Sequence, residues 1–190
     1  MNEKIKKIQA IIAETDKNFN PYYDVIPELI KKHNYRKGIE IGVFAGGHAL
    51  KLLDAGIDLL IGIDPYKMFE PGMPGLTDQQ DWDILRELVS ERLVGYGYLH
   101  MHLNSNDAHG FFVHASDLYD FVFIDGLHTA KQLKKDLGNY GALIKKGGIV
   151  ACHDYNHPSF FELTKVIDDY VKEHNKELII GPLHLVYWYQ

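Results

Sequence analysis

Short, almost wholly apolar runs alternate along the chain with segments whose apolar residues recur every three or four positions. Runs such as 59–63 and 121–124 are too short for buried helices and are typical of strands covered on both faces. The isoleucines of 4–13 instead recur at helical spacing and predict an amphipathic helix. We therefore expect strands within 38–43, 59–64, 98–103, 120–125, 147–154, 177–180 and 184–189.

Helices are expected between these runs. The pattern places them at 4–13, 22–33, 48–55, 81–94, 105–114, between 125 and 147, and at 159–173, with a break at 20–21 and an irregular loop over 65–80. Strands that alternate with helices predict an α/β fold, a doubly wound Rossmann-like and mostly parallel seven-stranded sheet with an antiparallel strand near the C-terminus. No repeat or linker divides the chain, so we expect one domain, 1–190, with a helical cap (1–35) on a core (36–190).

Composition narrows the classes of partner. The 190 residues carry a net charge of −6 without a basic run, which argues against a nucleic acid partner. No segment reaches the roughly 20 apolar residues of a membrane span, and the charged N-terminus does not resemble a signal peptide. The single cysteine, Cys152, lies in an apolar run and excludes an intrachain disulfide. A cytoplasmic protein is expected.

Two apolar runs end in an acid followed or preceded by a histidine. The run 120–124 leads into Asp125, with His128 three residues later, and the run 147–152 leads into His153 and Asp154. Neighbouring parallel strands present their carboxyl ends at the same edge of a sheet, where ligands bind in open α/β folds. The two aspartates and two histidines therefore predict a small metal centre.

The first predicted strand leads into a glycine turn. Glu40 lies on the strand, and Gly42 and Gly46 lie where the backbone bends into a helix whose first amides, up to His48, are suited to a carboxylate. Asp64 ends the next strand, about 20 residues further along the chain, which is the spacing at which an acid can accept hydrogen bonds from ribose hydroxyls. The pattern lacks the middle glycine that a pyrophosphate requires. It therefore favours S-adenosylmethionine over NAD.

These residues resemble a known family. The runs 40–48, 63–64, 123–128 and 147–154 are similar to class I S-adenosylmethionine-dependent methyltransferases. They are most similar to the small-molecule O-methyltransferases that use a divalent metal, which include catechol-type enzymes and a macrolide-sugar branch. The resemblance covers about 36–155, and it implies a small hydroxylated acceptor such as a sugar or a phenol.

The resemblance also implies roles for individual positions. Those expected at the cofactor are Glu40, Gly42, Phe44, Gly46, His48, Asp64, Ser105, Asn106 and Asp125. Within this set, Asp64 matches the ribose acid, Ser105 and Asn106 match a pair that flanks the adenine, and His48 replaces a serine that contacts the cofactor carboxylate. Asp125 and Asp154 match the metal aspartates, and His153 stands at the place of a third ligand. His128 matches the catalytic base of the sugar branch.

The expected chemistry is metal-assisted methyl transfer. A divalent cation at Asp125 and Asp154 would lower the pKa of the acceptor hydroxyl and fix its position. Carboxylates suit Mg²⁺, Ca²⁺ or Mn²⁺, and a histidine ligand favours Mn²⁺, Zn²⁺ or Fe²⁺. His128, with an ordinary pKa near 6.5, is suited to act as general base. The loop 65–80, through Tyr66, Met68, Phe69 and Met73, is expected to close over the acceptor.

Each of these residues also has a purely structural interpretation. Asp125 is a candidate helix cap, His128 a solvated loop residue, and His153 a donor to a backbone carbonyl. His100 and His102 share one strand face, which fits packing under a helix better than a zinc pair. Asp107 fits a helix start, and the aromatic residues 187–189 fit packing of the last strand.

Alternative functions remain open at this point. An NAD-linked oxidoreductase is disfavoured by the glycine spacing, and a non-catalytic cofactor-binding module would keep the nucleotide half alone. An iron and 2-oxoglutarate hydroxylase needs a His-x-Asp/Glu tripeptide, which the chain lacks. The sequence does not identify the acceptor or distinguish O- from N-methylation, and a homodimer is one option for the assembly.

Overall fold

The computed structural model describes residues 3–17, 22–69, 73–95, 97–112 and 119–190. Its strands are β1 (Lys37–Ile41), β2 (Leu59–Ile63), β3 (Tyr98–Met101), β4 (Tyr119–Ile124), β5 (Ile144–Cys152), β6 (Ile179–Ile180) and β7 (Val186–Tyr189). Its helices are α1 (Glu3–Lys17), α2 (Tyr22–His33), α3 (Gly47–Asp54), α4 (Gln79–Leu93), α5 (Ser105–His109), α6 (Ala130–Gly141) and α7 (Phe161–Glu173).

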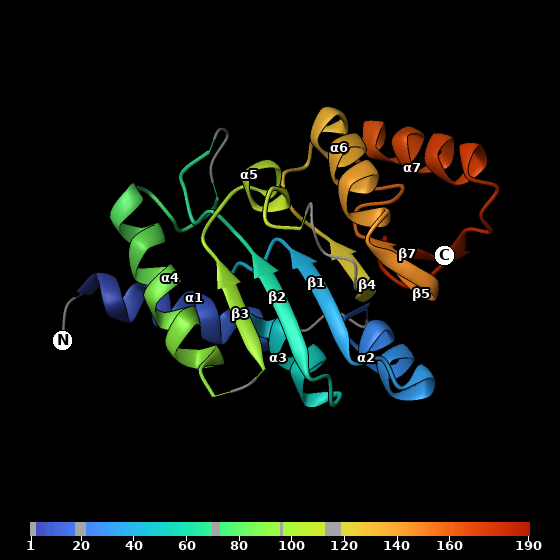
Figure 1. The fold of residues 1–190 in the computed structure, drawn as a ribbon. Coiled ribbons are helices and arrows are strands. Elements are labelled where there is room, and N and C mark those ends of the chain that lie inside the picture. Colours follow the sequence, from blue (N-terminus) through green and yellow to red (C-terminus); the bar gives the residue numbers. More distant parts are fainter. Residues whose placement is uncertain (1–2, 18–21, 70–72, 96, 113–118) are drawn as a thin grey trace.

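The strands form one sheet in the order β3-β2-β1-β4-β5-β7-β6, with helices against both faces (Figure 1). β1 to β5 pair in parallel, whereas β7 runs antiparallel to both of its neighbours. This arrangement confirms the predicted doubly wound, mostly parallel sheet with an antiparallel strand near the C-terminus. Parallel pairing follows from the crossover helices, because only a long connection returns the chain to the same end of the sheet.

The sheet separates two apolar cores. Alternate residues of a strand point to opposite faces, so Ile39 and Ile41 of β1 face the core beneath α5, α6 and α7. The other core lies beneath α1 to α4 and contains Phe121 and Phe123 of β4. Glu40 alternates with the isoleucines and therefore points into this second core. An acid thus lies on a central strand of a buried sheet face.

The strand register brings the ends of the central strands level. Ile41 pairs with Ile63 and with Ile124, and Ile124 pairs with Cys152. The pairing continues one step further, because the amide of Asp125 donates to the carbonyl of Ile41 at 2.8 Å. The residues that follow β1, β2, β4 and β5 consequently meet at one edge of the sheet.

Several predicted boundaries differ from the structure. β3 ends at Met101 rather than at 103, because the next residues turn into α5, and β5 begins earlier, at Ile144. The helix predicted at 105–114 ends at His109, and positions 113–114 lie outside the described residues, as do the break at 20–21 and residues 70–72 of the predicted loop. The rest of that loop is irregular apart from a bridge between Met73 and Leu76 and its last two residues, which already belong to α4.

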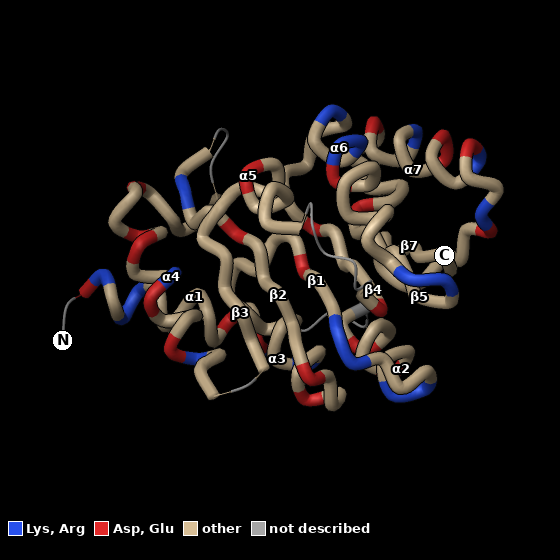
Figure 2. Tube along the Cα trace, in the orientation of Figure 1, with Lys and Arg blue, Asp and Glu red and all other residues tan. Residues whose placement is uncertain are grey.

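The first helix packs on α4 through charged side chains. Lys7 Nζ lies 2.7 Å from Asp81, and Arg92 of α4 donates to both carboxylate oxygens of Asp16. Within the described part of the chain, Lys and Arg are scattered over separate elements (Figure 2). Among the described helices, none combines the length and the apolar character that crossing a membrane requires.

Candidate active site

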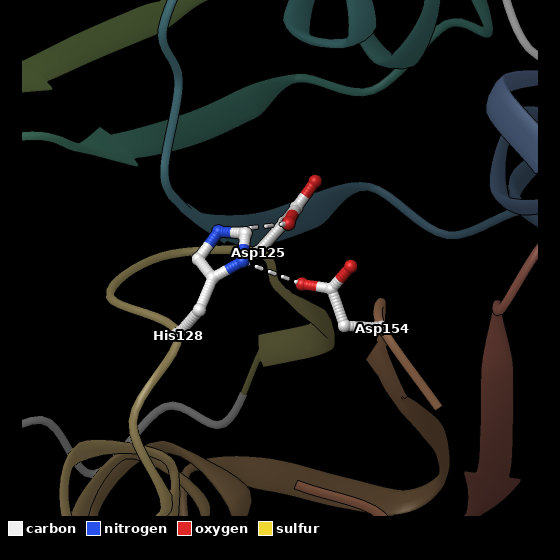
Figure 3. A group of neighbouring side chains, drawn as sticks. All are labelled: Asp125, His128 and Asp154. Atoms are coloured by element: carbon white, nitrogen blue, oxygen red, sulfur yellow. Dashed lines mark ion pairs between the residues drawn. The ribbon is translucent and has the colours of Figure 1, made fainter. Parts of the chain in front are cut away.

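Two aspartates and two histidines converge at the carboxyl edge of β4 and β5. His128 Nδ1 lies 2.8 Å from Asp154 Oδ2, and His128 Nε2 lies 3.9 Å from Asp125 Oδ1. Figure 3 shows the three side chains directed toward one another. One potential ligand atom from each of these residues lies within 4.8 Å of the others. The predicted convergence of the two strand-end acids is therefore observed.

His153 joins the same cluster through one ring nitrogen. Its Nδ1 lies 3.1 Å from Asp154 Oδ1 and 3.6 Å from Asp125 Oδ1, while its Nε2 lies 3.0 Å from the carbonyl oxygen of Leu183. Because a carbonyl only accepts, Nε2 carries the proton. Nδ1 is thus the nitrogen that faces the two carboxylates. His153 therefore contacts a backbone carbonyl through one ring nitrogen and faces the two acids through the other.

The cluster is electrostatically coupled. Burial opposes the charge of Asp154, but hydrogen bonds from His128 and His153 hold the pKa of this carboxyl well below its usual range. Burial likewise opposes the charge of His153, yet Asp125 and Asp154 raise the pKa of its imidazole to about 10. The pKa of His128 is raised by the same two acids against the effect of burial. Without a cation, protons on the histidines balance the carboxylates.

The local backbone explains how these side chains are placed. Asp154 adopts the left-handed region with φ of 65°, which aspartate tolerates better than most residues. His128 immediately precedes Thr129, whose hydroxyl caps α6 by accepting from the amide of Gln132. The alternative role of Asp125 as the helix cap is therefore wrong. The Asp125 carboxylate instead faces His128 and His153.

An open pocket lies beside the cluster. Besides Asp125, His128, His153 and Asp154, its walls include Asp136 of α6, which is buried. Sequence reasoning missed Asp136 because an acid within a helix ordinarily indicates a solvated face. The ring of Phe160 also packs edge-on against His128, with ring centroids 4.5 Å apart. The site thus combines charged groups with an aromatic neighbour.

The glycine turn after β1 packs against the same edge. Gly42 has φ of 89°, and a Cβ atom there would lie 1.9 Å from the carbonyl oxygen of Asp125. Gly46 has φ of 74° and its amide donates to the carbonyl of Val43 at 2.9 Å. Phe44 adopts positive φ without being glycine. At Gly42, then, a close backbone contact within the protein already requires glycine.

Asp64 is bonded to the backbone of this turn. One carboxylate oxygen accepts from the amides of Val43 and Phe44, each at 3.0 Å, and the other accepts from the amide of Tyr66 at 2.8 Å. Burial raises the pKa of Asp64, although these three amides act in the opposite direction. Asp64 therefore ties β2 to the turn. Its contact with ribose remains a prediction.

Glu40 and His48 form a buried pair. His48 Nδ1 lies 2.8 Å from Glu40 Oε1, and the two side chains are 5% and 1% exposed. Burial raises the pKa of Glu40, and His48 acts against this shift. The imidazole of His48 also packs against the ring of Phe123. In this structure His48 contacts Glu40. Its contact with a cofactor carboxylate stays a prediction.

The residues predicted to flank the adenine lie on α5. Ser105 is buried and its hydroxyl oxygen accepts from Gln132 Nε2 at 2.9 Å, while Asn106 is exposed and donates to Gln132 Oε1 at 3.0 Å. Gln132 was not predicted as a site residue. The one signal for it is the Thr-x-x-Gln pattern at the start of α6, which indicates a helix cap rather than a site.

Other predictions have clear outcomes. Tyr66 was expected in a lid over the acceptor, which is wrong: the core buries its ring, and its hydroxyl donates to the carbonyl of Phe44. Met68 and Phe69 are exposed. His100 packs under α4, where its Nδ1 lies 3.3 Å from Ser90 Oγ, as expected for a covered strand face. Asp107 lies in the first turn of α5, and Trp188 is fully buried in β7.

A family model described as a methyltransferase domain matches residues 39–155. This range covers more than half of the chain and contains the glycine turn and the whole acid–histidine cluster. The chain therefore belongs to the methyltransferase domain family. With the fold described above, it is a class I S-adenosylmethionine-dependent methyltransferase, and the NAD-linked alternative is abandoned.

Solved structures have the same fold. Calicheamicin methyltransferase CalS11 aligns with a TM-score of 0.69 at 12% identity, over 100% of this chain and 93% of that one. A putative caffeoyl-CoA O-methyltransferase from Staphylococcus aureus gives 0.68 at 14%, over 100% and 93%. The O-methyltransferase from Bacillus cereus, solved in complex with SAH, gives 0.66 at 11%, over 100% and 92%. None of the curated proteins matches the sequence. At these identities the likeness establishes the fold.

Proposed function

We propose that the protein transfers a methyl group from S-adenosylmethionine to a hydroxyl oxygen of a small molecule, with the help of a divalent cation. One observation carries the proposal: two aspartates and two histidines meet in an open pocket beside the glycine turn of a methyltransferase-family chain. The solved structures with this fold include proteins named as O-methyltransferases. These names favour oxygen over nitrogen as the methyl acceptor.

The donor set fits a divalent cation. Asp125 and Asp154 supply two carboxylates, and His153 Nδ1 lies within 3.6 Å of an oxygen of each. The carbonyl of Leu183 fixes the tautomer of His153, as the outer partner of a metal-bound histidine does. Carboxylates combined with imidazole favour Mn²⁺ over Mg²⁺. A bound cation would hold the acceptor hydroxyl and lower its pKa.

His128 is the proposed base. Its Nδ1 lies 2.8 Å from Asp154, so a neutral imidazole keeps its proton on Nδ1 and has a lone pair on Nε2. Nε2 would take the proton of the acceptor hydroxyl as the oxygen bonds to the methyl carbon and the carbon–sulfur bond breaks, with S-adenosylhomocysteine as the leaving group. For this step the acceptor oxygen would have to lie in line with the methyl carbon and the sulfur.

The side chains in and beside the pocket favour a phenol-like acceptor over a sugar. Phe160 packs against His128 and is stacked at 4.9 Å on His157, and Leu127 lines the pocket while remaining 51% exposed. Aromatic and aliphatic surfaces bind flat rings better than polyols. Comparing a catechol with a methyl glycoside as acceptor, with release of S-adenosylhomocysteine as the readout, tests this choice.

Calorimetry tests the cofactor and the metal together. We expect the protein to bind S-adenosylhomocysteine and Mn²⁺, and Asp125→Ala to lose Mn²⁺ while still binding S-adenosylhomocysteine. Asp169→Ala, on the exposed face of α7, is the matched control and is expected to bind both. Failure of the wild-type protein to bind S-adenosylhomocysteine would overturn the proposal. Mn²⁺ binding that survives in Asp125→Ala would overturn the metal assignment.

A further inference from the structure

The hairpin that joins β6 to β7 turns through two left-handed residues. The amide of Leu185 donates to the carbonyl of Pro182 at 3.1 Å and closes the turn 182–185. The central residues of this turn, Leu183 and His184, have φ of 47° and 66°. Positive φ at both central positions is typical of a type I′ turn, which ordinarily carries Asn-Gly or Asp-Gly. Leucine and histidine suit this backbone poorly, and such a departure is expected at strained or functional sites.

His184 is paired with both backbone groups of Tyr155, in the loop that follows β5. Its Nδ1 lies 3.0 Å from the carbonyl oxygen of Tyr155, and because a carbonyl only accepts, Nδ1 carries the proton. In the other direction, the amide of Tyr155 donates to the carbonyl of His184 at 3.0 Å. These two hydrogen bonds hold the left-handed turn against the loop.

The same turn contacts a residue of the acid–histidine cluster. The carbonyl oxygen of Leu183, the neighbour of His184, lies 3.0 Å from Nε2 of His153. Tyr155 directly follows Asp154, whose own φ is 65°. Both proposed cation ligands at the end of β5 therefore lie between two contacts with the turn. The ring centroids of His184 and His153 are 6.4 Å apart, so His184 acts on the cluster through its neighbours.

We propose that His184 is a positioning residue for the metal site. By pairing with Tyr155 it keeps the turn 182–185 in its left-handed form, and so keeps the carbonyl of Leu183 on Nε2 of His153. The inference rests on the proposed function, in which Nδ1 of His153 is a cation ligand. The partner of the other ring nitrogen matters for such a ligand, because it fixes the tautomer and the orientation of the ring.

Substitutions at His184 can remove the hydrogen-bond donor without opposing the backbone. His184→Gly loses the donor, and glycine adopts positive φ without strain. His184→Asn also tolerates positive φ and supplies a side-chain N–H in place of Nδ1, although it restores no imidazole. In calorimetry we expect His184→Gly to bind Mn²⁺ at least about tenfold more weakly than the wild-type protein, with its affinity for S-adenosylhomocysteine unchanged. His184→Asn is expected to recover most of the Mn²⁺ affinity.

His174 provides the matched control. Its Nδ1 makes the same kind of contact, 2.8 Å from the carbonyl oxygen of Tyr170, at the exposed C-terminal end of α7. His174→Gly is therefore expected to bind Mn²⁺ and S-adenosylhomocysteine as the wild-type protein does.

A second pair of variants decides if His184→Gly does not fold. His184→Asp has the shape of His184→Asn, but its carboxylate cannot donate a hydrogen bond. We expect His184→Asp to bind Mn²⁺ more weakly than His184→Asn, although its negative charge alone would attract the cation.

Three results would overturn the inference. One is a Mn²⁺ affinity of His184→Gly, or of His184→Asp relative to His184→Asn, that is not reduced. Another is a failure of His184→Asn to recover the affinity. The third is an equal loss of Mn²⁺ and S-adenosylhomocysteine binding in His184→Gly, since a merely structural role would weaken both alike. A wild-type protein that binds S-adenosylhomocysteine but not Mn²⁺ contradicts the proposed metal site instead, so the two failures are distinguishable.

Discussion

The two halves of the sheet edge use acids in opposite ways. After β4 and β5, Asp125 and Asp154 point at each other and at two histidines in an open pocket. After β2, Asp64 points at three backbone amides, and on β1 Glu40 is sealed against His48. An acid at a strand end can therefore face an open pocket or be hydrogen-bonded to the backbone of the fold. Its partners, rather than its position along the strand, tell which.

The comparison predicts its largest effect at the acid–histidine cluster. Asp154→Asn keeps the volume of the side chain but removes one charge from the proposed metal site. We expect kcat/KM to fall about a thousandfold or more, since the Lewis-acid contribution of a bound cation is several kcal/mol. The free energy of unfolding in urea should fall only moderately, because Asp154 is buried and the asparagine keeps its volume but no longer pairs as an anion with His128 and His153. Steady-state kinetics and urea melts of one preparation check both statements.

Asp64→Asn should act mainly on stability and not on the metal site. An asparagine presents an N–H group to at least one backbone amide that now donates to a carboxylate oxygen. We expect a loss of about 3 kcal/mol in the free energy of unfolding, with Mn²⁺ affinity unchanged. Asp107→Asn, exposed in the first turn of α5, is the matched control. An unchanged free energy of unfolding in Asp64→Asn would contradict the view that Asp64 stabilises the turn after β1.

The pH dependence of metal binding sharpens the contrast further. The raised pKa values of His128 and His153 mean that protons compete with a cation at neutral pH. As pH rises toward these values the protons leave more easily, so Mn²⁺ affinity should rise from pH 6.5 to 7.5, by about tenfold for each proton displaced. Titration calorimetry in two buffers measures the proton release. In His153→Ala the dependence should weaken, whereas the exposed His174→Ala should behave as wild type. An affinity that is flat with pH contradicts this account.

The fold and the location of the cluster followed from the sequence because both depend on short-range pattern. Apolar runs define the strands, and parallel strands bring Asp125 and Asp154 to one edge. The contacts that Asp64 and His48 make within the protein did not follow, because the backbone amides and the carboxylate that they contact belong to other strands and turns. Gln132 was missed for the same reason, since Ser105 and Asn106 lie on α5, and Asp136 was missed because an acid within a helix ordinarily indicates a solvated face. Helix and strand ends shifted where turns compete with regular pairing.

Diffraction from a crystal grown with Mn²⁺ and S-adenosylhomocysteine, recorded at the manganese absorption edge, tests the central claim most directly. We expect one anomalous peak between the carboxylates of Asp125 and Asp154, with a histidine nitrogen among the ligands. A peak elsewhere, or no peak while S-adenosylhomocysteine is bound, would show that these acids do not hold the cation.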